Sequence, residues 1–192
     1  MIGLYGGSFD PPHRGHVALA RRAKEELALE RLVVLVSAAP GHKQVETPAE
    51  VRLELSRAAF PDDEVLLDEY ARTVGTLRAH PEWADPVFVI GADQFCDFPS
   101  WHEPQEVLRL ARLAVATRPG FPQERLDAVL GRLTAPARVQ FFELDPIPVS
   151  SRDLRARLAA GEDVSAELPP AVADLIDAQG LYRRPPGYTE VA

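Results

Sequence analysis

Six short apolar runs alternate with longer amphipathic segments along this 192-residue chain. The runs are IGLY (2–5), LVVLV (32–36), VLL (65–67), VFVI (87–90), LAVA (113–116) and VQFF (139–142). Apolar residues are mostly continuous within each run rather than alternating with polar ones, which is typical of strands buried on both faces. Strands that alternate with helices predict an α/β fold, in which helices cover both faces of a mostly parallel sheet.

The amphipathic segments carry helix signals. In residues 16–30 the apolar side chains recur at helical spacing and share an arc of about 100°. For the next helix, Thr47 is expected as the N-cap, Pro48 as the first residue and Glu50 as the capping-box partner. Further helices are predicted over 104–111, 122–133, 151–160 and 170–179, the last two ended by Gly161 and Gly180. The pattern predicts a Rossmann-like, doubly wound sheet.

Charge and composition narrow the class of protein. Acidic residues outnumber basic ones by 29 to 21, giving a net charge of -8, which argues against a long nucleic-acid track. A few local cations can still bind a small anionic substrate. The one cysteine allows no internal disulfide, and no apolar stretch reaches the roughly 18 residues of a membrane span. We expect a soluble cytoplasmic protein that binds neither nucleic acid nor membrane, and that could form a homo-oligomer.

The turn after the first strand, GGSFDPPHRGH (6–16), concentrates residues suited to anion binding. Gly6 and Gly7 permit a close backbone approach, so consecutive N–H groups can face an anion. His13 and His16 are three residues apart, on one side of the incoming helix near its positive end. A strained loop with capping histidines is the structural alternative, and zinc bound by both histidines and Asp10 is a weaker one.

A second cluster, IPVSSRDLRARL (147–158), follows the last strand. Ser150 or Ser151 is expected to cap the next helix. Arg152 and Arg155 lie in its first turns, where the helix dipole disfavours cations unless an anion is bound. Asp153 could partly satisfy these arginines instead, and a solvated basic helix face is equally open on this segment alone.

Together these motifs resemble a known family. GGSFDPPHRGH matches the GGxFDPxHxGH signature, and SSRDLR resembles the SSTxIR signature, of the HxGH nucleotidyltransferase superfamily. Within it the chain most resembles the bacterial nicotinate-nucleotide adenylyltransferases. The resemblance covers nearly the whole chain, and four further segments carry it: PGHK (40–43), IGADQFCDFPSW (90–101), RPG (118–120) and GLY (180–182).

The resemblance implies an enzyme of NAD biosynthesis. Such enzymes join ATP and nicotinic acid mononucleotide by direct in-line attack, giving nicotinic acid adenine dinucleotide and pyrophosphate, with Mg²⁺ carried by ATP. The nucleotidyltransferase domain is expected over 1–184, with a C-terminal helical part at 150–182 and a flexible tail at 185–192. Two alternatives stay open: another transferase of the superfamily, such as phosphopantetheine adenylyltransferase, and a non-catalytic nucleotide-binding regulatory protein.

Carried over by position, the resemblance assigns roles to individual residues. The catalytic set, which would contact the ATP phosphates, is His13, His16, Lys43 and Arg155. The remaining ATP-binding residues would be Gly7, Ser8, Phe9, Gly91, Asp93, Ser150 and Ser151. Asp93 would accept hydrogen bonds from the ribose; the alternative is an aspartate that caps the next helix.

On the mononucleotide side, Trp101 would stack on the pyridine ring and the backbone at His102 would receive the carboxylate. Thr76 belongs to a stretch, 71–76, that helps to line the pyridine pocket in the family. The chain departs from the family pattern at Gly41, Gly75 and Arg152. Because Gly75 lies in the stretch that helps to line the pyridine pocket, its departure bears on the identity of the mononucleotide rather than on the type of reaction.

Overall fold

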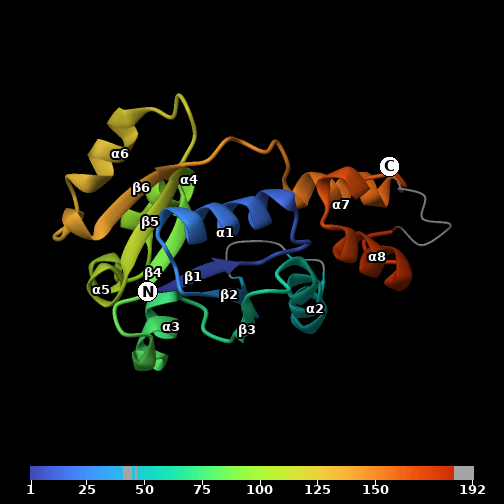
Figure 1. Cartoon of the computed structure of the whole chain (residues 1–192), viewed down its shortest axis with the longest axis horizontal. Helices are drawn as coiled ribbons and strands as arrows, with labels where there is room; N and C mark the ends of the chain where they lie inside the picture. The colour runs from blue at the N-terminus through green and yellow to red at the C-terminus, as the bar shows by residue number, and fades with distance from the viewer. Residues whose placement is uncertain (41–44, 46, 184–192) are drawn as a thin grey trace, which may run out of the picture.

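The structure, a computed structural model, describes residues 1–40, 45 and 47–183. Its centre is one six-stranded, all-parallel sheet of order β3-β2-β1-β4-β5-β6 (Figure 1). The strands are β1 (Ile2–Gly7), β2 (Arg31–Ser37), β3 (Glu64–Asp68), β4 (Val87–Gly91), β5 (Arg112–Thr117) and β6 (Val139–Glu143). Each predicted strand is present within one or two residues of its expected bounds, and the Rossmann-like fold is confirmed.

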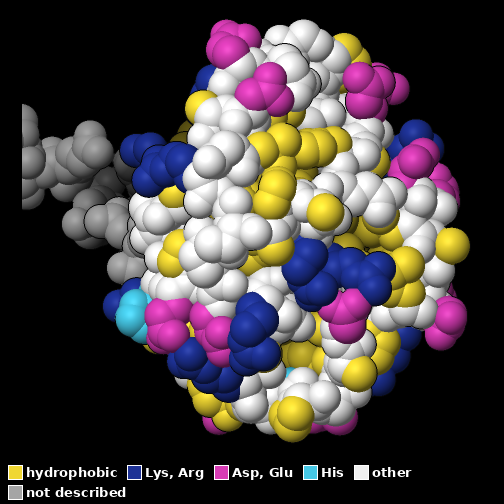
Figure 2. Space-filling model, turned by 90° about the vertical axis from the view of Figure 1, so that its left-hand side faces the viewer, with side chains coloured by type: hydrophobic (Ala, Val, Ile, Leu, Met, Phe, Trp, Pro, Cys, Tyr) yellow, Lys and Arg dark blue, Asp and Glu magenta, His cyan; other side chains and the backbone are white. Residues whose placement is uncertain are grey.

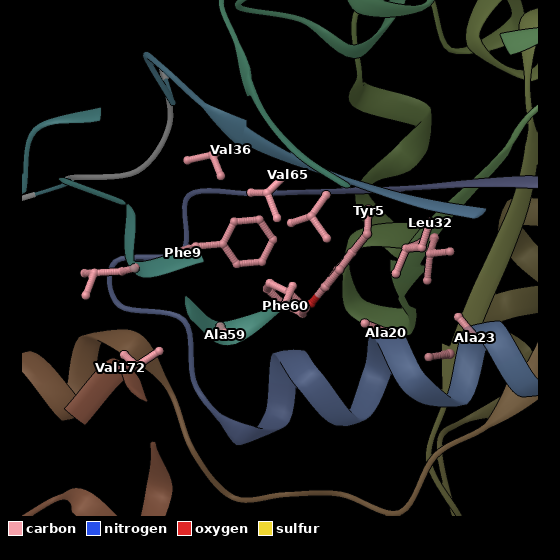
Figure 3. Close-up of a cluster of buried hydrophobic side chains, with 14 of the residues drawn as sticks. Tyr5, Phe9, Ala20, Ala23, Leu32, Val36, Ala59, Phe60, Val65 and Val172 are labelled. Carbon is pink, nitrogen blue, oxygen red and sulfur yellow. The ribbon is translucent and has the colours of Figure 1, made fainter. Parts of the chain in front are cut away.

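The strands are apolar throughout because both faces of the sheet are buried. Successive side chains of a strand point to opposite faces. Thus Tyr5 packs into one core cluster while its neighbour Leu4 packs into the other, and Val34 and Val33 divide in the same way. Figure 3 shows the first cluster, in which Ala20 and other small side chains let a helix approach the strands closely.

Helices cover both faces of the sheet. They are α1 (Arg14–Glu26), α2 (Ala49–Ala59), α3 (Thr73–Ala79), α4 (Ala92–Asp97), α5 (Pro104–Leu110), α6 (Gln123–Leu130), α7 (Ser151–Ala159) and α8 (Pro170–Gln179). Buried side chains of α1, α2, α7 and α8 belong to the Tyr5 cluster, whereas those of α3 to α6 belong to the Leu4 cluster. The two C-terminal helices therefore share the core of the sheet.

The helix ends agree with the sequence pattern in part. Gly180, at φ 62°, ends α8 directly, and Gly161, at φ 79°, follows the end of α7. However, α1 stops at Glu26, four residues before its predicted end, and the Glu30 N–H bonds instead to the Met1 carbonyl as β2 approaches. The backbone needs these residues to turn from the helix into the sheet.

The predicted cap of α2 is wrong. Pro48 occupies the N-cap position and makes no side-chain capping bond, so there is no capping box with Glu50. Thr47 is buried, and its carbonyl accepts a hydrogen bond from the Arg52 side chain at 3.0 Å. Tertiary packing of this threonine has overridden the local signal.

Surface arginines are compensated by neighbouring carboxylates. Arg78 pairs with Glu103, and Arg112 pairs with Asp85. Figure 2 shows basic and acidic side chains next to one another on the face that it presents. In the described part of the chain, no helix is long and apolar enough to cross a bilayer. The predicted tail, 185–192, lies outside the described residues.

Candidate active site

The strand order reverses at β1: β2 and β3 lie on one side of it, and β4, β5 and β6 lie on the other. In open α/β sheets ligands bind at such a switch point, beyond the carboxyl ends of the strands. A cleft of about 770 Å³ lies there. Its lining includes Gly7, Ser8, Phe9, His13, His16, Gly91, Asp93, Ser150, Ser151 and Arg155. The structure thus brings together residues expected at the ATP site from distant segments of the chain.

The two histidines stack at the start of α1. Their ring centroids are 3.7 Å apart with planes inclined by 20°, and the His13 N–H donates to His16 Nδ1 at 3.2 Å. His13 is only 7% exposed, and burial lowers its pKa to about 4. The imidazole is therefore neutral near pH 7. Its Nδ1 is buried with no hydrogen-bond partner among the described residues, an arrangement suited to a ligand contact.

Gly7 and Gly15 leave space for the neighbouring rings of Phe9 and His13. A Cβ on Gly7 would lie 2.8 Å from the Phe9 ring, and one on Gly15 would lie 3.1 Å from the His13 ring. Phe9 adopts φ 48° while its side chain is 1% exposed and packs edge-on against His16 at 5.1 Å. The buried Phe9 ring anchors the turn in the core and leaves the backbone at the cleft.

The start of α7 is fastened to this turn by contacts across about 140 residues of sequence. Ser151 Oγ donates to the Pro11 carbonyl at 2.8 Å. Arg155 Nη1 donates to the Asp10 carbonyl, also at 2.8 Å. Ser150 is the N-cap, accepting from the Asp153 N–H at 3.1 Å, which settles the open choice between the two serines. The second motif therefore faces the first across the cleft.

Asp10 is the centre of a buried cluster with Tyr182 and Arg155, a grouping that the sequence did not predict. Its carboxylate is 1% exposed, accepts from the Tyr182 hydroxyl at 2.8 Å, and lies 3.8 Å from Arg155. Burial raises the pKa of the Tyr182 phenol above its ordinary value, which keeps the hydroxyl protonated as a donor. The sequence signal for Tyr182 was the GLY match at 180–182.

Asp93 lies in the first turn of α4, whose N-cap is Gly91. It is exposed at the cleft, 3.8 Å from Arg118 and 3.9 Å from Arg125. A Cβ on Gly91 would meet no atom within 4 Å, so the space beside it is open. Asp93 is consequently available at the cleft rather than used as a helix cap. Arg152, the departure from the second signature, also lines the cleft.

The residues expected on the mononucleotide side lie outside this cleft lining. Thr76 is within α3, 2% exposed, and its hydroxyl is 3.0 Å from both carboxylate oxygens of Asp68. Trp101 is half-buried, with its ring centroid 6.2 Å from that of Phe88. His102 is exposed. The Thr76 hydroxyl is therefore engaged by Asp68, whereas part of the Trp101 side chain is exposed to solvent.

Two further expectations concern a loop lysine and metal ions. Lys43, together with the departure at Gly41, lies outside the described residues. Within the residues that the structure does describe, no three His, Cys, Asp or Glu side chains are grouped so that they could hold a metal ion. The zinc alternative also loses its third ligand, because Asp10 is turned toward Tyr182.

Comparison with known proteins identifies relatives over most of the chain. The cytidylyltransferase-like family matches residues 4–157. A probable nicotinate-nucleotide adenylyltransferase of Thermus thermophilus is 36% identical over 95% of this chain and 99% of its own length. Its counterpart in Rubrobacter xylanophilus is 33% identical, covering 95% and 92%.

A solved structure supports the architecture independently. Plasmodium falciparum nicotinic acid mononucleotide adenylyltransferase complexed with NaAD has a TM-score of 0.74 against this chain. The match covers 94% of this chain and 96% of the other, at 20% sequence identity. At that identity the likeness shows the fold alone.

Proposed function

This chain belongs to the nicotinate-nucleotide adenylyltransferase family, and from that premise we propose that it joins ATP to nicotinic acid mononucleotide. The products are nicotinic acid adenine dinucleotide and pyrophosphate. One observation carries the proposal beyond family membership. The stacked histidines and Arg155, from opposite ends of the sequence, line one cleft at the switch point of the sheet.

The chemistry is an in-line displacement. An oxygen of the mononucleotide 5′-phosphate forms a new bond to the α-phosphorus of ATP, and the bond from that phosphorus to the bridging oxygen of pyrophosphate breaks. The attacking phosphate is already ionised, so no strong base has to remove a proton. Positioning of the reactants and stabilisation of negative charge therefore supply the rate.

The residues at the cleft suit those two tasks. Neutral His13 can donate one hydrogen bond to a phosphate oxygen, because a neutral imidazole keeps one ring N–H. His16 lies beside it, and Arg155 with Ser151 would hold the departing pyrophosphate. Asp93 would accept hydrogen bonds from the adenosine ribose. Lys43 stays a proposed phosphate contact.

We expect Mg²⁺ to arrive with ATP. Mg²⁺ takes oxygen ligands and commonly keeps several waters, so triphosphate oxygens can hold it where the protein offers few carboxylates. The one carboxylate expected to touch ATP, Asp93, is flanked by Arg118 and Arg125. When bound, the ion would neutralise charge on the triphosphate, while the protein groups orient the α-phosphorus.

The mononucleotide is proposed to bind beyond Phe88, toward Trp101. The Phe88 ring lies between these regions: it contacts Trp101, and its Cζ is 3.1 Å from where a Cβ on Gly6 would be. Trp101 would stack on the pyridine ring, and backbone donors at His102 would favour a carboxylate over an uncharged amide. Thr76 would contribute by fixing Asp68 and the start of α3.

A substrate panel tests the assignment. Pyrophosphate release is measured with Mg-ATP and, in turn, nicotinic acid mononucleotide, nicotinamide mononucleotide and phosphopantetheine. We expect turnover with the first, less with the second and none with the third. Turnover with phosphopantetheine alone would replace the assignment with the sibling enzyme. ATP binding by calorimetry without turnover of any acceptor would indicate the non-catalytic alternative.

A further inference from the structure

Arg52 is a buried cation that no sequence signal distinguished. It lies on α2 and is only 1% exposed, although helices of this kind usually bury apolar residues. Burial lowers the pKa of its guanidinium, which nevertheless stays protonated near neutral pH. Placing a cation there is unfavourable unless each of its donors finds an acceptor. The position thus calls for a role other than packing.

Its acceptors are four backbone carbonyls from three segments. Nη1 donates to Ser8 and to Ser37, each at 2.8 Å, and Nη2 donates to Ala38 at 3.1 Å. Nε donates to Thr47 at 3.0 Å. One planar group consequently joins the turn after β1, the end of β2 and the residues just before α2. A lysine could not match this, because its ammonium is a single point of donation.

The hydrogen bond from Arg52 to the Ser8 carbonyl fixes the direction in which the Ser8–Phe9 peptide unit points. The carbonyl and the following N–H of a trans peptide unit point in opposite directions. Arg52 is absent from the cleft lining and approaches from the β2 side, so the Ser8 carbonyl is turned away from the cleft. The Phe9 N–H must then point toward it. That N–H has no backbone acceptor among the described residues.

We propose that Arg52 is a positioning residue that, by holding the Ser8 carbonyl, aims the Phe9 N–H at the ATP triphosphate. The same guanidinium fixes this turn relative to Ala38 and Thr47, which flank Lys43 in the sequence. The inference rests on the proposed function, since it requires ATP in the cleft. It predicts a defect in ATP use that exceeds any defect in mononucleotide binding.

The experiment compares Arg52→Lys and Arg52→Gln with a matched control, Ser56→Ala. Ser56 lies one turn further along α2, is fully buried, and donates to the Arg52 carbonyl at 2.7 Å, so its loss disturbs the same helix without releasing the turn. Steady-state kcat and KM for each substrate, and thermal unfolding, are measured for every variant. We expect kcat/KM for ATP to fall by about 10- to 100-fold in both Arg52 variants, with KM for the mononucleotide changed by less than about twofold.

The outcomes separate positioning from stability. Ser56→Ala should lower the melting temperature and leave kcat/KM for ATP near the wild-type value. The proposal is overturned if Arg52→Lys keeps wild-type kcat/KM for ATP. It is also overturned if both substrates are affected equally, or if neither Arg52 variant folds, because Arg52 would then be purely structural.

A binding measurement keeps the inference distinct from the proposed function. If the wild-type protein turns over no mononucleotide, the proposed function has failed. ATP binding by calorimetry then decides about Arg52: the dissociation constant should rise about tenfold in Arg52→Lys and stay unchanged in Ser56→Ala. Equal ATP affinity in wild type and Arg52→Lys would reject the positioning role.

Discussion

Replacing Gly15 by alanine should damage catalysis more than folding. Gly15 lies in the first turn of α1, between the two histidines of the turn. An added Cβ would lie 3.1 Å from two atoms of the His13 ring and 3.2 Å from Val149 Cγ1. Comfortable contacts between carbon atoms begin near 3.5 Å, so the neighbours must retreat by about 0.4 Å. Because the His13 ring is stacked on His16, its retreat would disturb the geometry of both histidines.

The free-energy terms partly cancel. Overpacking of this kind costs about 1–3 kcal/mol, whereas alanine in place of glycine stabilises a helix by up to ~1 kcal/mol. For a chain of this length the net loss lowers the melting temperature by no more than about 8 °C. Catalysis has no compensating term: since a 1 Å misplacement can cost about 100-fold, a shift of ~0.4 Å in His13 should lower kcat by roughly tenfold.

The assay is pyrophosphate release at a temperature well below the melting point, alongside thermal unfolding. Gly131→Ala is the control. Gly131 ends α6, is exposed, and would place its Cβ 3.4 Å from the Asp127 carbonyl, outside the cleft. It should retain wild-type kcat. Wild-type kcat in Gly15→Ala would refute the view that this glycine keeps His13 in place.

Three further expectations concern His13, Tyr182 and Trp101. Because folding lowers the pKa of His13 from its ordinary 6.5 to about 4, the unfolded chain binds more protons between these values. The free energy of unfolding should thus fall by ~3 kcal/mol as the pH drops from 6.5 to 4, a dependence that denaturant titrations should find missing in His13→Gln. Tyr182→Phe leaves buried Asp10 short of a donor and should cost about 1–3 kcal/mol by the same titrations, while exposed Tyr70→Phe should cost nothing measurable. Trp101→Ala should raise KM for the mononucleotide about tenfold without changing KM for ATP; an unchanged mononucleotide KM would remove Trp101 from the pocket.

Local sequence was sufficient for the strands and for the two adjacent histidines of the turn after β1. The run LVVLV is apolar at every position, as expected of a strand with helices packed on both faces of its sheet, and β2 forms there. His13 and His16 are close in sequence at a helix start, so their proximity follows from helical spacing. The glycine stops of α7 and α8 are equally local, since they depend on one residue adopting positive φ.

The predicted helix cap at Thr47 failed because contacts formed in the folded chain compete with the local signal. The cap signal at Thr47 is sound in isolation, yet its carbonyl serves Arg52 and its side chain is buried. The placement of Thr76 beside the pyridine pocket stays a prediction, and its hydroxyl is bonded to Asp68 at the end of β3. Arg52 itself looked like an ordinary helix residue because nothing in its neighbourhood shows which carbonyls will surround it.

Buried parallel strands, and a first turn with two neighbouring imidazoles, could be predicted from the amino-acid pattern alone. Periodicity and spacing are local properties, so they can be recognised before the fold is known. The contacts of Asp10 with Arg155 and Tyr182, and of Arg52 with the Ser8 carbonyl, could be recognised only in the folded chain. Those contacts depend on strand order and on which loops share the carboxyl edge of the sheet, and no pattern within one segment encodes them.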